Sequence, residues 1–190
     1  MKNKGQSYRK RVIVFGFEGK NNKTEMNYFS HFKPKDDRYI LKCLSSGVTD
    51  PKGMIDSIKN KRKDYDYNSR EDLTFIFMDE DCDEAKRIKI DNLEKKISKD
   101  IVIVRSSPIF ELWFLNHFCR TTKEYMSNSE LIEDLNKFIV NYNKSQDYFE
   151  LLKDKTDKAL DNSAYQKKFG KDCTSTDVVD IVNKIVIFKE

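Results

Sequence analysis

Two short apolar runs in the sequence each end in acidic residues, and this pairing constrains the fold more than any other feature. Residues 11–17 (RVIVFGF) precede Glu18, and residues 72–78 (DLTFIFM) precede Asp79 and Asp81. Both runs are β-branched and aromatic and lack polar alternation, which is typical of strands buried on both faces of a parallel sheet. Ligands of open parallel sheets bind beyond the carboxyl ends of the strands, so we expect the three carboxylates to converge.

The rest of the chain continues this alternation of strand and helix. We predict further strands at 38–45 and 101–104, and helices from about Thr24, at 51–65, at 84–98 and at 108–118. Such an order is typical of right-handed βαβ units and a parallel sheet. The later segments 129–142, 147–154 and 175–188 read as helices, with Ser175 as a cap, although residues 185–188 also fit a strand. Thr24 is the expected cap of its own helix.

These patterns together predict one α/β domain over residues 1–190. It has a mainly parallel sheet flanked by helices, a basic tail at 1–10, and a mostly helical extension at 121–190. Its length suits a single core.

Composition excludes several classes of protein. Charged residues make up 36% of the chain, and the apolar runs fall far short of the ~20 residues of a membrane span. The basic amino terminus leads into a strand without a cleavable apolar segment, so we expect a cytoplasmic protein without membrane contact. P-loop, dinucleotide-binding and nucleophile-elbow motifs are absent. Four dispersed cysteines and two histidines do not form a zinc motif.

The acidic strand ends suggest a metal site. Asp79 and Asp81 are two residues apart in extended chain, so both carboxylates can face one cation. Clustered carboxylates are tolerated when one is protonated or a cation lies between them, and Mg²⁺ (or Mn²⁺) suits oxygen ligands. Acids of a strand-to-helix loop, such as Asp83, also cap the next helix, so a structural role remains open.

Two further glutamates extend the candidate site. Glu18 follows its strand directly, and the adjacent Gly19 permits a tight turn. Glu25 stands in the first turn of the next helix, where the helix dipole alone would favour it.

The third element is the run SSPIFELWFLNHF at residues 106–118. We expect Ser107 to cap and Pro108 to begin a helix that is apolar nearly all round and therefore buried. Glu111 in this helix needs a partner, either the helix dipole or a shared metal ion. His117 is expected to be a core residue beside Trp113.

Charge is unevenly distributed along the chain. Up to Arg38 there are ten Lys or Arg against four Asp or Glu. A basic rim around the acidic centre would suit a polyanionic substrate, while a lysine-rich surface explains the count equally well. Tyr142 and Lys144 could place a cation near a phosphate, and a solvated loop explains them as well.

Three segments carry a family resemblance: EGKNNKTEMNYF (18–29), FMDED (77–81) and SSPIFELWFLNHF (106–118). Together they resemble the RloB-like family, also known as AbiLii-type abortive-infection proteins, which is associated with phage defence and related to the Toprim fold. The resemblance implies that Glu18, Asp79 and Asp81 hold a divalent metal, and an EGxTE stretch in related nucleases is similar to the region of Glu25. Many members have a shorter loop than KNNK at 20–23.

These observations favour a metal-dependent nuclease acting on RNA or DNA, with Glu18, Asp79, Asp81, Glu111 and Glu25 as catalytic or metal-binding residues. Two alternatives remain. The chain could be a non-catalytic, nucleic-acid-binding or regulatory subunit of a partner ATPase, because the genes of the family are often found near ATPase genes. It could also process a small nucleotide. A homo-oligomer is compatible with each hypothesis.

Overall fold

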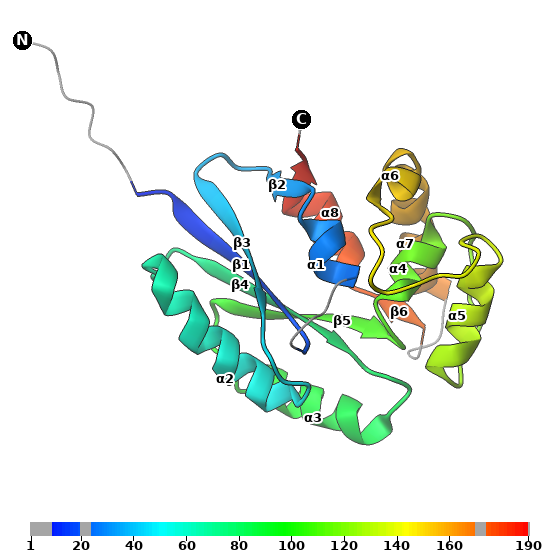
Figure 1. The fold of residues 1–190 in the computed structure, drawn as a ribbon. Coiled ribbons are helices and arrows are strands. Elements are labelled where there is room, and N and C mark those ends of the chain that lie inside the picture. Colours follow the sequence, from blue (N-terminus) through cyan, green and yellow to red (C-terminus); the bar gives the residue numbers. More distant parts are fainter. Residues whose placement is uncertain (1–8, 20–23, 170–173, 190) are drawn as a thin grey trace, which may run out of the picture.

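A five-stranded sheet organises the part of the chain that the computed structural model describes, namely residues 9–19, 24–169 and 174–189 (Figure 1). The strand order is β3-β1-β4-β5-β6, and the strands are β3 (Tyr39–Ser45), β1 (Arg11–Phe17), β4 (Leu73–Asp79), β5 (Ile101–Ser107) and β6 (Ser175–Thr176). The first four are parallel, and β6 is antiparallel to β5. The predicted fold class, a mainly parallel sheet flanked by helices, is confirmed.

Two helices cover one face of the sheet. These are α2 (Pro51–Lys61), continued by the 3-10 helix η1 (Arg62–Tyr65), and α3 (Glu84–Glu94), which lie below the strands in Figure 1. Met54 and Ile58 of α2 and Ile90 of α3 are completely buried in one apolar cluster with side chains of the strands. Gly16 of β1 faces this layer, because a Cβ atom added there would lie 2.8 Å from Ile58 Cγ1. The strand and α2 therefore approach closely only because this residue is glycine.

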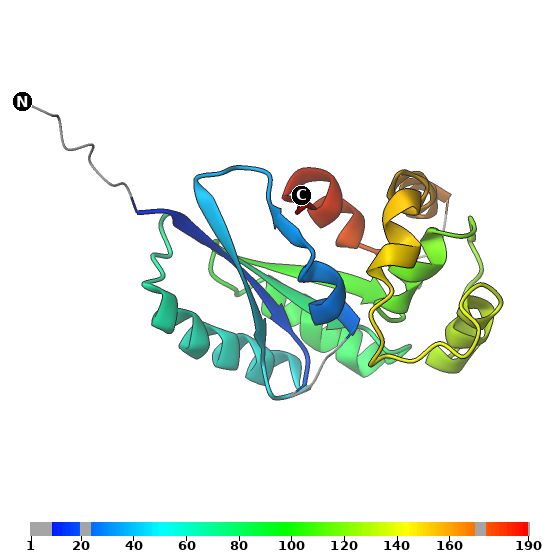
Figure 2. The same cartoon turned by 45° about the horizontal axis from the view of Figure 1, so that its top comes forward.

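The other face carries a larger, aromatic core. It is covered by α1 (Thr24–Phe29), α4 (Glu111–Asn116), α5 (Asn128–Asn136), α7 (Thr156–Phe169) and α8 (Val178–Lys184), and the turned view of Figure 2 shows the same two layers. Phe15 of β1 makes edge-to-face contacts with Phe29 of α1 and Phe75 of β4. Such packing fixes α1 against the sheet.

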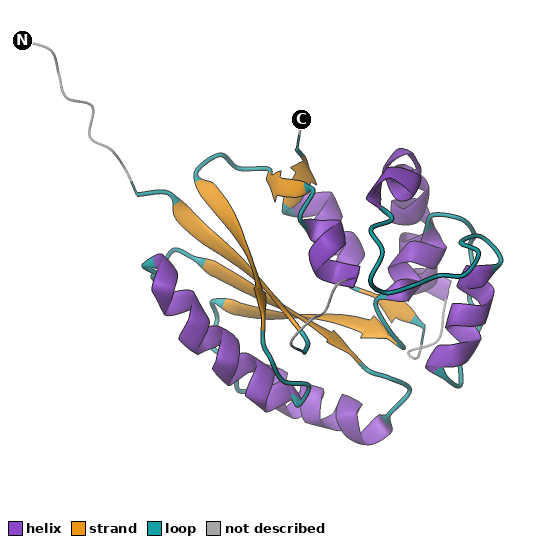
Figure 3. Ribbon diagram, viewed as in Figure 1, coloured by secondary structure: helices purple, strands orange, loops and turns teal. Residues whose placement is uncertain are grey.

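A second, two-stranded sheet joins the segment after α1 to the last strand of the described chain. In it, β2 (Phe32–Pro34) pairs antiparallel with β7 (Val186–Phe188), as the secondary-structure colours of Figure 3 show. The strand alternative for residues 185–188 was therefore the right one. The expectation that Ser175 caps the last helix is wrong, because Ser175 belongs to β6 and α8 begins at Val178.

The helix predicted at 108–118 begins later than expected. Ser107 is the last residue of β5, and α4 starts at Glu111 without a side-chain cap from its own N-cap residue, Phe110. A side chain from another strand takes over this role, as described below. The predicted burial is confirmed, since every residue of α4 is buried.

Helix α7 is absent from the sequence prediction because its buried face is not apolar. Asn162, Ser163 and Gln166 point into the protein and meet Asn116 of α4. Amide hydrogen bonds replace the apolar stripe that sequence analysis detects. The 121–190 segment thus packs on α4 through α7 and supplies β6 to the central sheet. It also contains α6 (Phe149–Leu152) and the 3-10 helix η2 (Lys153–Lys155).

Among the described residues, none of the helices is both long and apolar enough to cross a lipid bilayer.

Candidate functional site

The carboxyl ends of β1, β4 and β5 bring the predicted acidic residues to one edge of the sheet. Glu18 follows β1, and Asp79 is the last residue of β4. Glu111 begins α4, four residues after β5 ends, and Glu25 lies in the first turn of α1. Both Glu25 and Glu111 are at least 95% buried, although neither lies in a strand.

Asp79 lies at the centre of this group. Burial, followed by the charges of Glu25, Glu111 and Asp81, raises the pKa of Asp79 well above its usual value. Its Oδ1 accepts a hydrogen bond of 2.8 Å from the backbone N–H of Phe110, and so Asp79 caps the start of α4. The side chain is therefore held in place while its negative charge is opposed by three neighbouring carboxylates.

A lysine links Glu18 to the same group. Lys86 Nζ lies 2.5 Å from Asp81 Oδ2 and 3.5 Å from Glu18 Oε2. Burial opposes the charge of Lys86, but the hydrogen bond and charge of Asp81 outweigh it, so the pKa of Lys86 is raised. Burial also raises the pKa of Glu18, although Lys86 partly offsets this effect. One ammonium thus bridges two carboxylates from different strand ends.

The turn after β4, which positions Asp81, has an unusual backbone conformation. Asp81 and Cys82 have φ values of 55° and 54°, which are uncommon outside glycine. Asp81 is held there by Lys86 and by Asn128, whose Nδ2 donates to Asp81 Oδ1 at 2.9 Å. Asp83 caps α3 by accepting from the N–H groups of Ala85 and Lys86, which confirms the structural role expected for it.

Glu111 has its own partners in the segment after α5. Tyr142 donates its hydroxyl hydrogen to Glu111 Oε1 (2.9 Å), and Lys144 Nζ lies 3.1 Å from the same oxygen. Burial and the charge of Glu111 raise the pKa of Tyr142, so the phenol keeps its proton. Thr24 completes the link by donating to the carbonyl oxygen of Lys144 (3.1 Å).

The two partners of Glu111 differ in exposure. The Lys144 side chain is 62% exposed, whereas that of Glu111 is 2% exposed. Lys144 therefore reaches the buried carboxylate from solvent.

His117 lies outside this group. His117 is fully buried, its Nδ1 donates to the carbonyl of Trp113 (2.8 Å), and burial lowers its pKa to about 4. Its assignment to the core is confirmed. The cysteines Cys43, Cys82 and Cys119 are free, and Cys173 lies outside the described residues.

The basic rim expected around the acidic centre is wrong for four of the ten cations that suggested it. Arg9, Lys10 and Arg11 stand at the amino end of β1, and Arg38 precedes β3. A seven-residue strand is roughly 20 Å long, so these cations lie at the opposite edge of the sheet. Lys20 and Lys23 lie outside the described residues. At the acidic edge the contacts come instead from Lys86 and Lys144.

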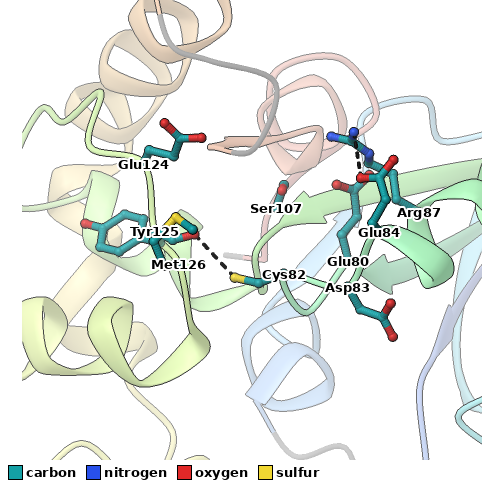
Figure 4. A pocket seen from close by; sticks show the side chains of 9 residues that line it. All are labelled: Glu80, Cys82, Asp83, Glu84, Arg87, Ser107, Glu124, Tyr125 and Met126. Atoms are coloured by element: carbon teal, nitrogen blue, oxygen red, sulfur yellow. Dashed lines mark hydrogen bonds and ion pairs between the residues drawn. The ribbon is translucent and has the colours of Figure 1, made fainter.

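A small cavity of about 160 Å³ borders the other side of the turn after β4 (Figure 4). Cys82 donates to the carbonyl of Tyr125 across it, and Glu84 pairs with Arg87 at its margin. Asp79 and Asp81 do not line it. The acidic group therefore belongs to the edge of the sheet and not to this cavity.

Lys86 and Asn128 were missed by the sequence analysis. Lys86 stands three residues after the cap Asp83, so a first-turn position facing the strand end was the available signal. Asn128 is the first residue of α5 and far from Asp81 in sequence, and nothing in its local pattern indicates the contact.

In the described part of the chain, no three His, Cys, Asp or Glu side chains stand in a ready-made metal-binding geometry. The chemistry of the donors nevertheless fits a hard divalent cation, because they are all carboxylates. The negative charge of Asp79 is also disfavoured by burial and by the neighbouring carboxylates. In the metal-free protein Lys86 and Lys144 supply the positive charge.

One protein-family model matches this sequence. The model described as RloB-like protein matches residues 13–185, which is most of the chain and includes all five candidate acids. The protein belongs to the RloB-like family. Searches of the curated proteins and of the solved structures gave no significant match.

Proposed function

We propose that this RloB-like protein is a metal-dependent nuclease that hydrolyses phosphodiester bonds of RNA or DNA in bacterial phage defence. Membership of the RloB-like family fits a defence-related role. The proposal for the chemistry is supported by one observation above all. Asp79, which accepts a hydrogen bond from the Phe110 N–H at the start of α4, lies among three other carboxylates at the carboxyl edge of a parallel sheet.

Asp79, Asp81, Glu111, Glu25 and Glu18 are the residues that would hold Mg²⁺ or Mn²⁺. A bound ion would polarise the scissile phosphate and lower the pKa of an attacking water. In this proposal the protein is related to Toprim-type nucleases, consistent with the resemblance of its strand-end motifs.

The other side chains have roles that follow from their positions. Lys144 approaches Glu111 from solvent, so it can move to a phosphate oxygen when a metal ion neutralises Glu111. Lys86 keeps Glu18 and Asp81 oriented. Glu18 is the proposed general acid or base, because it lies at the rim of the group and is only partly buried.

Cleavage assays test this proposal directly. Transfer RNA, single-stranded RNA and plasmid DNA are incubated with wild-type protein in Mg²⁺, Mn²⁺ or EDTA. We expect metal-dependent cleavage that falls at least ~100-fold in Asp79→Asn and Asp81→Asn, as when a group essential to the transition state is removed. Asp56→Asn is the matched control, since Asp56 is an exposed carboxylate on α2 that pairs only with Lys52 among the described residues.

The outcomes separate the proposal from its rivals. Cleavage that persists in both site variants would show a contaminant or a different site. The absence of cleavage with any substrate at protein concentrations far above the substrate would favour a subunit that acts with a partner ATPase.

A further inference from the structure

The outer strand of the central sheet has a free edge. β3 pairs with β1 on one side, and it has no strand on its other side within the described chain. It is seven residues long, and Lys42 is its only charged residue. Exposed edge strands are usually protected by charges, bulges or proline, because they otherwise pair with other chains.

The hydrogen-bond pattern shows which groups of β3 point outward. The carbonyl of Arg38 accepts from Arg11 N–H, and the N–H of Ser46 donates to the carbonyl of Phe17. The backbone N–H and C=O groups of the even-numbered residues of β3 therefore point towards β1, because these groups point to opposite sides in successive strand residues. Leu41 and Cys43 consequently direct their N–H and C=O groups away from the sheet.

A groove of about 430 Å³ runs along this edge, between β3 and the small β2–β7 sheet. Its wall is apolar and includes Phe29, Phe32, Leu41 and Cys43. Burial raises the pKa of the Cys43 thiol to about 11, so this side chain is neutral. Alternate side chains of a strand added beside β3 would point into this groove.

The rim of the groove is positively charged. Lys10, Lys33 and Lys189 line it, against the single acid Asp37. Two copies of this chain pairing through β3 would bring these lysines together, which disfavours self-association.

We propose that the free edge of β3 binds an extended, acidic segment of a partner protein by β-strand addition. Main-chain hydrogen bonds to Leu41 and Cys43 would supply affinity, the groove would take apolar side chains, and the lysines would select acidic ones. This surface lies at the amino end and outer edge of the sheet, so it is independent of the acidic site.

Hydrogen exchange of individual amides tests this proposal in the full-length protein. The probe is a synthetic seven-residue peptide of alternating Glu and Val, compared with its Lys-Val counterpart. We expect the acidic peptide to slow exchange of the Leu41 and Cys43 amides at least ~10-fold. The amides of Ile40 and Lys42, which face β1, serve as internal controls and should change little.

Charge-reversal variants test the role of the rim. Lys10→Glu/Lys33→Glu should weaken binding of the acidic peptide about tenfold, while Lys89→Glu/Lys99→Glu, which reverses two exposed lysines elsewhere, should not. Binding of the acidic peptide without protection of the two amides would overturn the proposal in favour of non-specific attraction. Protection that increases with protein concentration alone would overturn it in favour of a second copy, and absence of binding would overturn it outright.

Discussion

Replacing Asp79 by Asn should make the metal-free protein more stable. Asn keeps an oxygen that can accept from the Phe110 N–H, and it removes the negative charge that burial and three carboxylates oppose. Enzymes commonly hold such destabilised groups at their sites, so a gain in stability accompanied by a loss of function is the expected signature.

The magnitude follows from the neighbours of Asp79. Of the three carboxylates that repel Asp79, Glu111 is compensated by Lys144 and Asp81 by Lys86. The net repulsion on Asp79 is therefore about that of one carboxylate. Two unit charges about 6 Å apart repel by about 3 kcal/mol at an effective dielectric constant of about 20. Loss of the favourable charge at the start of α4 subtracts about 0.5–1 kcal/mol. The net gain is about 2 kcal/mol, or a rise in Tm of roughly 4–8 °C for a chain of this length.

The dependence on pH has a definite sign. Because the pKa of Asp79 is raised in the folded state, the destabilisation is complete at high pH and disappears as Asp79 becomes protonated. The difference in stability between Asp79→Asn and wild type should therefore shrink as the pH falls towards about 4, the pKa of an unfolded Asp.

Thermal unfolding in EDTA and in Mg²⁺ measures these effects. We expect Mg²⁺ to raise the Tm of wild type and not that of Asp79→Asn, with Asp56→Asn behaving as wild type. A lower Tm of Asp79→Asn in EDTA, together with equal responses to Mg²⁺, would refute the reasoning.

Three further changes test other parts of the account. Lys86→Met leaves Glu18 and Asp81 without their shared ammonium, so the metal-free protein should lose about 1–3 kcal/mol in urea unfolding, and Mg²⁺ should restore part of it; no loss would show that the bridge is unimportant. Gly16→Ala places a Cβ 2.8 Å from Ile58 Cγ1 and should cost about 1–3 kcal/mol, less in an Ile58→Val background if the clash is the cause. Because burial lowers the pKa of His117 to about 4, wild type should lose about 2 kcal/mol between pH 7 and pH 5, where unfolded His takes up a proton and buried His117 does not. His117→Asn should flatten this pH dependence, and an unchanged slope would assign it to other groups.

The sequence predicts those parts of the structure that depend on local pattern. β1, which Glu18 follows, and β4, which ends at Asp79, are recognisable because they are short, apolar and β-branched. Their parallel arrangement places both acids at one edge. The burial of Glu111 follows from the apolar residues around it.

Other features depend on contacts that local pattern does not encode. Helix α7 buries polar side chains, and α4 is capped by Asp79 from another strand. Arg9 to Arg11 are close in sequence to Glu18, yet the length of β1 separates them from it. Proximity in sequence therefore misled the charge argument, whereas strand direction explains the observed arrangement.

The most direct test of the proposed metal centre is to locate Mn²⁺ on the ¹⁵N-labelled protein by paramagnetic broadening of its amide signals. A trace contaminant that cleaves nucleic acid cannot affect this measurement. We predict that substoichiometric Mn²⁺ broadens the amides of Glu18, Asp79, Asp81 and Glu111 first, and that Asp79→Asn abolishes this selectivity. Broadening spread over exposed carboxylates such as Asp56, or unchanged in the variant, would contradict the assignment of the acidic edge as a metal centre.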